Sequence, residues 1–225
     1  MKNRMKTVIG VIVGVVILIG AIWLINETRY PNVPAFDDHF TRKFLNKDKK
    51  ADNGFYEFKS KTDQYTMWFP EKYQVLHKYR EDYTRNGESY ENWSAAYIKS
   101  YENDQQTYAI KAEFSENDTK SELIYVESLF EEQLDSKKPK QLETSNTRIY
   151  YDSAYTYFHG TNQHIVHDSK ENPPNLYVAY VADKSSDKVI KLIYDSVGEN
   201  TETNQRDRKK WFLKMLQNIK FVKGN

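Results

Sequence analysis

The order of apolar and polar residues divides the chain into one long apolar stretch and a series of short patterned segments. Residues 8–25 contain no charged or strongly polar side chain. Beyond residue 54, short aromatic and β-branched runs predict strands, and apolar side chains at helical spacing predict two helices, over about 119–134 and 204–219. The strand runs are residues 55–59, 65–69, 93–101, 108–114, 148–158, 176–182 and 189–194. Because most connections are too short for crossovers, we predict an α+β domain with a mostly antiparallel sheet flanked by helices, preceded by one transmembrane helix.

The apolar stretch of residues 8–25 is long enough to cross a bilayer as a helix. Eighteen residues rise by about 27 Å, close to the ~30 Å hydrocarbon core. A cleaved signal peptide is the alternative, but the stretch ends near Trp23 without an Ala-x-Ala cleavage site, which favours a retained signal-anchor. Gly10 and Gly14 form a small-xxx-small spacing. Such a spacing allows two helices to pack closely, so it either indicates a homodimer through this helix or occurs by chance.

The charges around this stretch predict its orientation. Lys2, Arg4 and Lys6 precede it and no acidic residue does, so the positive-inside rule places residues 1–7 in the cytoplasm. The expected location is therefore the plasma membrane, with a single pass and the C-terminal domain extracellular. No cysteine follows the stretch, so the sequence excludes lipoprotein processing.

Residues 26–53 are expected to form a stalk between the membrane and an extracytoplasmic domain of residues 54–225. Phe36, Phe40 and Phe44 recur at a spacing of four and predict one apolar helix face. One interpretation is that this face binds the membrane surface or a partner. The other, which we favour, is that it packs on the protein's own domain. Residues 46–54 are expected to be a charged connector. Further along, Thr119 and Glu122 have the spacing of a capping box.

The order of elements resembles the PsbP-like family, which comprises extrinsic photosystem subunits, bacterial exported relatives and a Ran-binding eukaryotic cousin. The resemblance rests on an aromatic-Pro corner at residues 68–73 (WFPEKY), the two strands and helix after it, and the closing segment at residues 215–221 (MLQNIKF). It covers about residues 55–222. It implies an antiparallel sheet flanked by helices, used for binding rather than catalysis, with no family-wide catalytic residues to carry over.

Composition excludes several functional classes. The chain has a formal net charge of +1, and the first 26 residues hold three cations without an acid, so the remainder is nearly neutral and nucleic-acid binding is not expected. With Cys 0, a disulfide framework, a thiolate nucleophile and a thiolate metal site are all excluded. No phosphate-binding glycine loop or hydrolase motif occurs, and we expect no cofactor and no enzymatic activity.

Two local clusters are candidate sites. His159, His164 and His167 are candidate metal ligands, because imidazole nitrogens bind zinc and copper; solvated histidines are the alternative. Three tyrosines share one face of the strand at 148–158 and form a candidate ligand or partner surface, against the alternative of ordinary packing. They are Tyr151, Tyr155 and Tyr157.

The expected function is a membrane-anchored extracytoplasmic accessory module that engages a partner protein or an envelope component. A metal-assisted or carboxylate-dependent hydrolase of envelope polymer is the first alternative, and it requires a pocket with converging polar groups. A structural spacer without a ligand is the second alternative.

Overall fold

The computed structural model describes residues 16–19, 27–100, 105–117, 119–169, 171–197 and 205–223. The helical elements are α2 (Pro34–Asp37), η1 (Thr41–Lys43), η2 (Thr119–Ser121), α3 (Glu122–Leu134) and α4 (Gln205–Gln217). The strands are β1 (Leu45–Asp52), β2 (Phe55–Lys59), β3 (Tyr65–Pro70), β4 (Gln74–Val75), β5 (Tyr83–Asn86), β6 (Tyr90–Ser100), β7 (Gln105–Glu116), β8 (Lys140–Glu143), β9 (Thr147–His159), β10 (Asn162–Val166), β11 (Leu176–Asp183), β12 (Lys188–Val197) and β13 (Lys220–Phe221). All seven predicted strands are contained in or overlap these elements.

The strands form two sheets, and every pair of neighbouring strands is antiparallel. The smaller sheet has the order β1-β2-β3-β13, so the last strand of the chain closes beside an early one. The larger sheet has the order β10-β9-β11-β12-β7-β6-β4, with β5 on β6 and β8 on β9. The predicted α+β class with a mostly antiparallel sheet and flanking helices is confirmed for the domain.

The structure corrects one part of the predicted fold class, the preceding transmembrane helix. Of the predicted span of residues 8–25, the structure describes residues 16–19 alone. Across the described part of the chain, no helix combines the length and the apolar character needed to cross a membrane. The single-pass anchor and the homodimer through that helix are therefore wrong as predictions, while Gly10 and Gly14 themselves lie outside the described residues.

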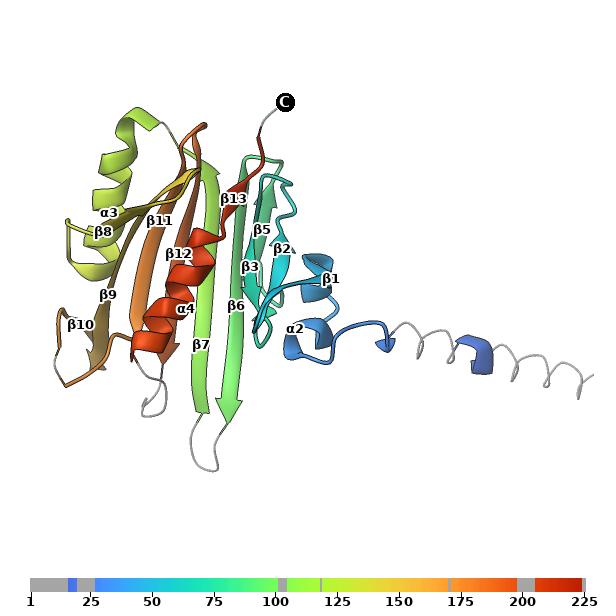
Figure 1. Ribbon diagram of the computed structural model, residues 1–225. Helices are drawn as coiled ribbons and strands as arrows, with labels where there is room; N and C mark the ends of the chain where they lie inside the picture. Colours follow the sequence, from blue (N-terminus) through green and yellow to red (C-terminus); the bar gives the residue numbers. More distant parts are fainter. Residues whose placement is uncertain are drawn as a thin grey trace, which may run out of the picture.

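The central strand β11 explains why the domain has two apolar cores. All eight of its residues are buried, because both faces of the larger sheet are covered at this point. Tyr177 and Ala179 face a central core between the two sheets and α4. Val178 and Tyr180 face a second core beneath α3. Figure 1 shows α4 and α3 on opposite sides of the larger sheet.

The C-terminal helix α4 closes the central core as its spacing predicts. Phe212, Met215, Leu216 and Ile219 are at most 2% exposed. The ring centroid of Phe212 lies 5.5 Å from that of Tyr177 on β11. The apolar stripe of this segment therefore holds the helix against the larger sheet.

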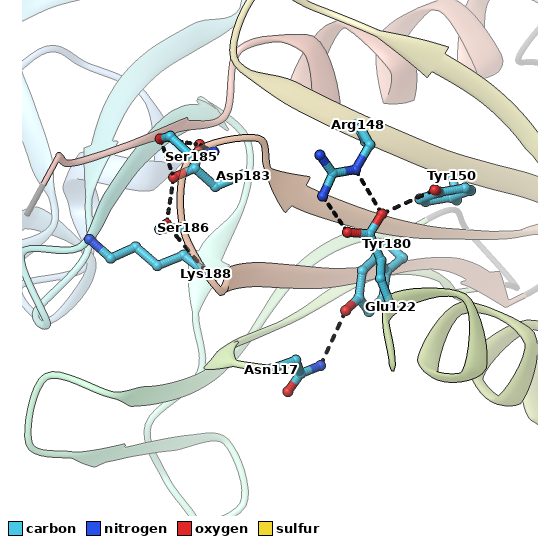
Figure 2. Close-up of polar contacts among 9 residues, drawn as sticks. All are labelled: Asn117, Glu122, Arg148, Tyr150, Tyr180, Asp183, Ser185, Ser186 and Lys188. Atoms are coloured by element: carbon cyan, nitrogen blue, oxygen red, sulfur yellow. Dashed lines mark hydrogen bonds and ion pairs between the residues drawn. The ribbon is translucent and has the colours of Figure 1, made fainter. Parts of the chain in front are cut away.

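Helix α3 covers the other face, and an ion pair fixes its first residue. Glu122 is the first helical residue, after an N-cap at Ser121, so the capping box predicted from Thr119 is wrong in its position. The Glu122 carboxylate instead accepts hydrogen bonds from the Nε of Arg148 at 2.9 Å and the hydroxyl of Tyr150 at 3.0 Å. Figure 2 shows both β9 side chains pointing at this carboxylate.

The N-terminal aromatic segment packs on the domain, but not as one continuous helix. Phe36 and Phe44 are 1% and 2% exposed, and Phe40 is partly buried against the central core. The helix breaks at Asp38, whose backbone is extended and whose carboxylate accepts a 2.7 Å hydrogen bond from the Thr41 amide. The charged connector predicted after it is in fact the edge strand β1.

Candidate ligand-binding site

The three candidate histidines separate into a pair and a single residue. The ring centroids of His159 and His164 are 6.5 Å apart across the β9–β10 hairpin, and His164 stacks on Tyr157 at 5.0 Å. The Nε2 of His167 instead lies 2.7 Å from the carbonyl oxygen of Leu134, at the end of α3. Within the part of the chain that the structure describes, no three His, Asp or Glu side chains group as a metal centre would require. The metal site stays a prediction.

The three candidate tyrosines also occupy different surroundings. Tyr155 and Tyr157 stack on each other at 5.9 Å and line a cavity of about 860 Å³ at the start of β11. Tyr151 packs against the central core, with the ammonium of Lys209 5.9 Å from its ring centroid. The structure thus associates two of the three with a cavity.

A second cavity, of about 350 Å³, has the stronger aromatic character and is called the aromatic cleft below. It lies where α4 begins, beside the turn that follows β3 and the strands β6, β7 and β12. Five aromatic side chains line it: Tyr73, Tyr97, Tyr108, Tyr194 and Trp211. Its volume falls in the range of ligand sites, at the small end.

The aromatic rings of the cleft form one continuous cluster. Tyr73 stacks on Trp211 at 5.8 Å, and Tyr97 stacks on Tyr108 at 5.8 Å across the β6–β7 pair. Tyr73 and Tyr97 are 6.0 Å apart and connect the two stacks. Trp211 reaches Tyr194 on β12 at 5.2 Å. Because each ring is held by its neighbours, the walls are ordered before any ligand arrives.

Burial keeps the deepest phenols of the cleft neutral. It raises the pKa of Tyr73 and that of Tyr194 above their ordinary values, and their hydroxyls share a hydrogen bond. Both groups therefore keep their protons at physiological pH. They add hydrogen-bonding capacity to an apolar wall without adding charge.

Charged side chains of both signs surround the aromatic walls. Glu71, Lys72, Asp207 and Arg208 line the cleft. The Lys72 ammonium lies 5.8 Å from the centroid of the Tyr97 ring, and Glu71 Oε2 lies 3.5 Å from the Nζ of Lys50. Arg208 is 4% exposed. The site combines apolar ring faces with carboxylate, ammonium and guanidinium groups, so it can stack on a flat ligand and hydrogen-bond to its hydroxyls.

Sequence patterns did not reveal this site. Its aromatic residues come from the β3–β4 turn, three strands and α4, and no local spacing connects them. The one available signal is Pro70 followed by Tyr73, the aromatic-Pro corner that carries the family resemblance. That corner brings Tyr73 to the cleft, but the sequence alone does not show which rings it meets.

Two antiparallel sheets with helices on both faces of the larger one define an α+β domain, and the aromatic cleft is a candidate ligand site in it. The profile of the YvcA_Mog1p family, described as "Putative lipoprotein YvcA", matches residues 31–220, and the chain belongs to this family. Neither the curated proteins nor the solved structures gave a match. The family name does not include PsbP, so the predicted resemblance is supported only in part, by a family whose name includes Mog1p.

The family description also bears on location. A lipoprotein family indicates an envelope-associated protein that faces away from the cytoplasm, in agreement with the extracytoplasmic part of the prediction. The 225-residue chain itself contains no cysteine to which a lipid could be attached.

Proposed function

We propose that this protein is a non-enzymatic extracytoplasmic accessory module, of PsbP-like fold, that binds a saccharide of the cell envelope in the aromatic cleft. The observation that carries the proposal is the convergence of five aromatic side chains and four charged ones on one cavity of about 350 Å³. Membership of a family described as lipoproteins supports the envelope location.

A sugar ring matches both parts of the cleft. Its C–H face is apolar and flat, and it packs on the ring faces of Trp211 and Tyr97, whereas its hydroxyls require donors and acceptors around the edge. Glu71 and Asp207 supply acceptors, and Lys72 supplies a donor. A purely apolar ligand would take water away from these charged groups without offering them hydrogen bonds, which disfavours it.

The cleft favours a small ligand over a flat protein interface. A protein partner usually buries about 800 Å² on each side, which is a surface rather than a cavity. The ordered ring cluster fits an occupant of one or two sugar rings. We therefore choose an envelope component, and not a partner protein, from the two ligand classes that the sequence predicts.

The test is calorimetric titration of the purified full-length chain with soluble oligomers of N-acetylglucosamine, with glucose oligomers as a comparison. We expect saturable binding to at least one series, weakened by about tenfold or more in Trp211→Ala. Trp68→Ala is the matched control. Trp68 and Trp211 both pack on Phe55, at 5.8 and 6.1 Å, but Trp68 does not line the cleft.

Equal affinity of the wild-type chain and Trp211→Ala would overturn the proposal, provided that both melt cooperatively. Absence of binding to either series would also overturn it, and it would favour a spacer without a ligand.

A further inference from the structure

The larger cavity, of about 860 Å³, shares only Arg208 with the lining of the aromatic cleft and has a different chemistry. It is called the polar pocket below. It lies at the start of β11, and its lining includes Gln133 of α3, the end of β9 and the β7–β12 pair. Phe158, Leu176 and Ile193 contribute apolar surface, and Lys111 and Asp195 contribute opposite charges.

The strand register explains why these two charges remain apart. On the same face of the β7–β12 pair, Lys191 lies directly opposite Glu113, and the two form an ion pair at 2.7 Å. Asp195 instead lies opposite Ala109, and Lys111 lies opposite Ile193, so the two charged residues are diagonal neighbours. Among the residues that the structure describes, neither belongs to an ion pair, although the Lys111 charge does act on the Asp195 carboxyl.

The charged form of the Asp195 carboxyl is destabilised in this position because the group is partly desolvated. Burial raises its pKa, and the Lys111 charge and a hydrogen bond from the Ser196 amide only partly oppose that effect. A group that is desolvated and faces a cavity gains from a ligand that donates hydrogen bonds to it.

The wall of the pocket is fixed in advance by one asparagine. Asn175 Oδ1 accepts a 2.7 Å hydrogen bond from the Thr156 amide, and its Nδ2 donates one of 2.7 Å to the Thr156 carbonyl. The backbone of Asn175 also bonds to Ala154 and Ser196. The loop that precedes β11 is thereby held to both neighbouring strands, so a ligand has little ordering cost to overcome.

We propose that the polar pocket binds a free α-amino acid with an apolar side chain, its ammonium at Asp195 and its carboxylate at Lys111. A ligand with one cation alone would face the Lys111 ammonium, and a ligand with one anion alone would face Asp195. A zwitterion satisfies both at once, because its charges are separated by two bonds and bridge the diagonal gap. Phe158, Leu176 and Ile193 then contact the side chain.

Two further charged residues line the pocket, and they balance each other. Glu171 adds a negative charge and Arg208 a positive one. Arg208 donates from its Nη1 toward the Pro174 carbonyl at 3.4 Å, and the same atom lies 3.5 Å from the Ser196 hydroxyl on β12. The net charge of the lining is therefore zero, as a zwitterionic ligand requires.

The test titrates the full-length chain with L-leucine, L-leucinamide and N-acetyl-L-leucine. We expect L-leucine to bind, and loss of either charge from the ligand to weaken binding by about tenfold or more. In Lys111→Met, L-leucine and L-leucinamide should bind equally weakly, since the partner of the carboxylate is gone. In Asp195→Asn, L-leucine and N-acetyl-L-leucine should bind equally weakly, since the partner of the ammonium is gone.

Lys191→Met and Glu113→Gln are the matched controls, because both residues lie on the same two strands but outside the pocket lining. They should bind L-leucine as the wild-type chain does. The proposal is overturned if the wild-type chain does not bind L-leucine at millimolar concentration, or binds the three ligands alike. These outcomes leave the saccharide proposal untouched, because neither Lys111 nor Asp195 lines the aromatic cleft.

Discussion

The hydroxyl of Tyr65 on β3 donates a 3.0 Å hydrogen bond to the carboxylate of Glu91 on β6, and this contact joins the two sheets. Both side chains are fully buried. The second carboxylate oxygen accepts from the Tyr83 hydroxyl at 3.0 Å and from the Lys61 amide at 2.9 Å. Trp93 completes the network by donating from its indole nitrogen to the Tyr65 oxygen at 2.8 Å.

The first prediction concerns the pH dependence of stability at Glu91. Burial raises the pKa of Glu91. The hydrogen bonds from Lys61, Tyr65 and Tyr83 lower this pKa, but their effect is smaller than that of burial. Its folded pKa thus exceeds its unfolded pKa of about 4.3. The resulting stabilisation is complete below the unfolded pKa and is lost as pH rises through the folded pKa.

Replacing this carboxyl by an amide should therefore flatten the loss of stability with rising pH. We expect Glu91→Gln to show a smaller decrease in the free energy of unfolding above about pH 4 than the wild-type chain, measured by urea denaturation at several pH values. Glu127→Gln, at an exposed carboxylate on α3, is the control and should retain the wild-type slope. An unchanged slope in Glu91→Gln would show that this carboxyl is not the group that titrates.

The second prediction compares two buried phenols. Tyr65→Phe removes a donor from the Glu91 carboxylate and an acceptor from the Trp93 indole, so it should lower the free energy of unfolding by about 2 kcal/mol. Tyr177 is 2% exposed, and its hydroxyl has no hydrogen-bond partner in the described structure. Tyr177→Phe should therefore be neutral or stabilising. Similar losses in both variants, measured by denaturant unfolding, would contradict this account.

The fold was predictable where burial leaves a periodic signal. The strand β11 is recognisable because both of its faces are covered and all its residues are apolar except the terminal Asp183. The edge strand β1 was missed for the opposite reason, since a mostly exposed edge strand tolerates the sequence LNKDKKAD without alternation. At Phe36 and Phe40 the helical spacing is real, but the carboxylate of Asp38 binds the Thr41 amide and ends the helix between them.

The candidate sites were less predictable than the fold. Tyr155 and Tyr157 were found because they share one face of a single strand, and both line the polar pocket. Trp211 and Tyr73 could not be connected, because their stacking depends on how α4 crosses the sheet. Sites made by one element leave a local pattern, whereas sites made by several elements require the topology.

The third prediction concerns the attachment of α3. The hydrogen bond from Arg148 holds the pKa of Glu122 below its ordinary value, with burial as the smaller, opposing effect. This stabilisation is present above the unfolded pKa of about 4.3 and is lost as pH falls through the folded pKa. Arg148→Met should lower the free energy of unfolding at pH 7 by about 2 kcal/mol, with the difference shrinking in acid.

The control for this ion pair is an exposed one on the same sheet. Lys140 pairs with Asp152 at 2.6 Å, but its side chain is 54% exposed. Lys140→Met should therefore cost less than about 1 kcal/mol at every pH. An Arg148→Met defect that persisted unchanged in acid would indicate lost packing of the Arg148 stem and not a lost ion pair.

The last prediction separates His167 from the two other histidines of its segment. Its Nε2 donates to the Leu134 carbonyl, one of the groups at the end of α3 that lack a partner within the helix. His167→Ala should lower the free energy of unfolding by about 1 kcal/mol, because that carbonyl is partly buried and loses its donor. His159→Ala is the matched control, since His159 is exposed and its ring contacts only that of His164 among the described aromatic contacts. Hydrogen exchange of the last turn of α3 should accelerate in His167→Ala alone, and equal acceleration in both variants would contradict the assignment.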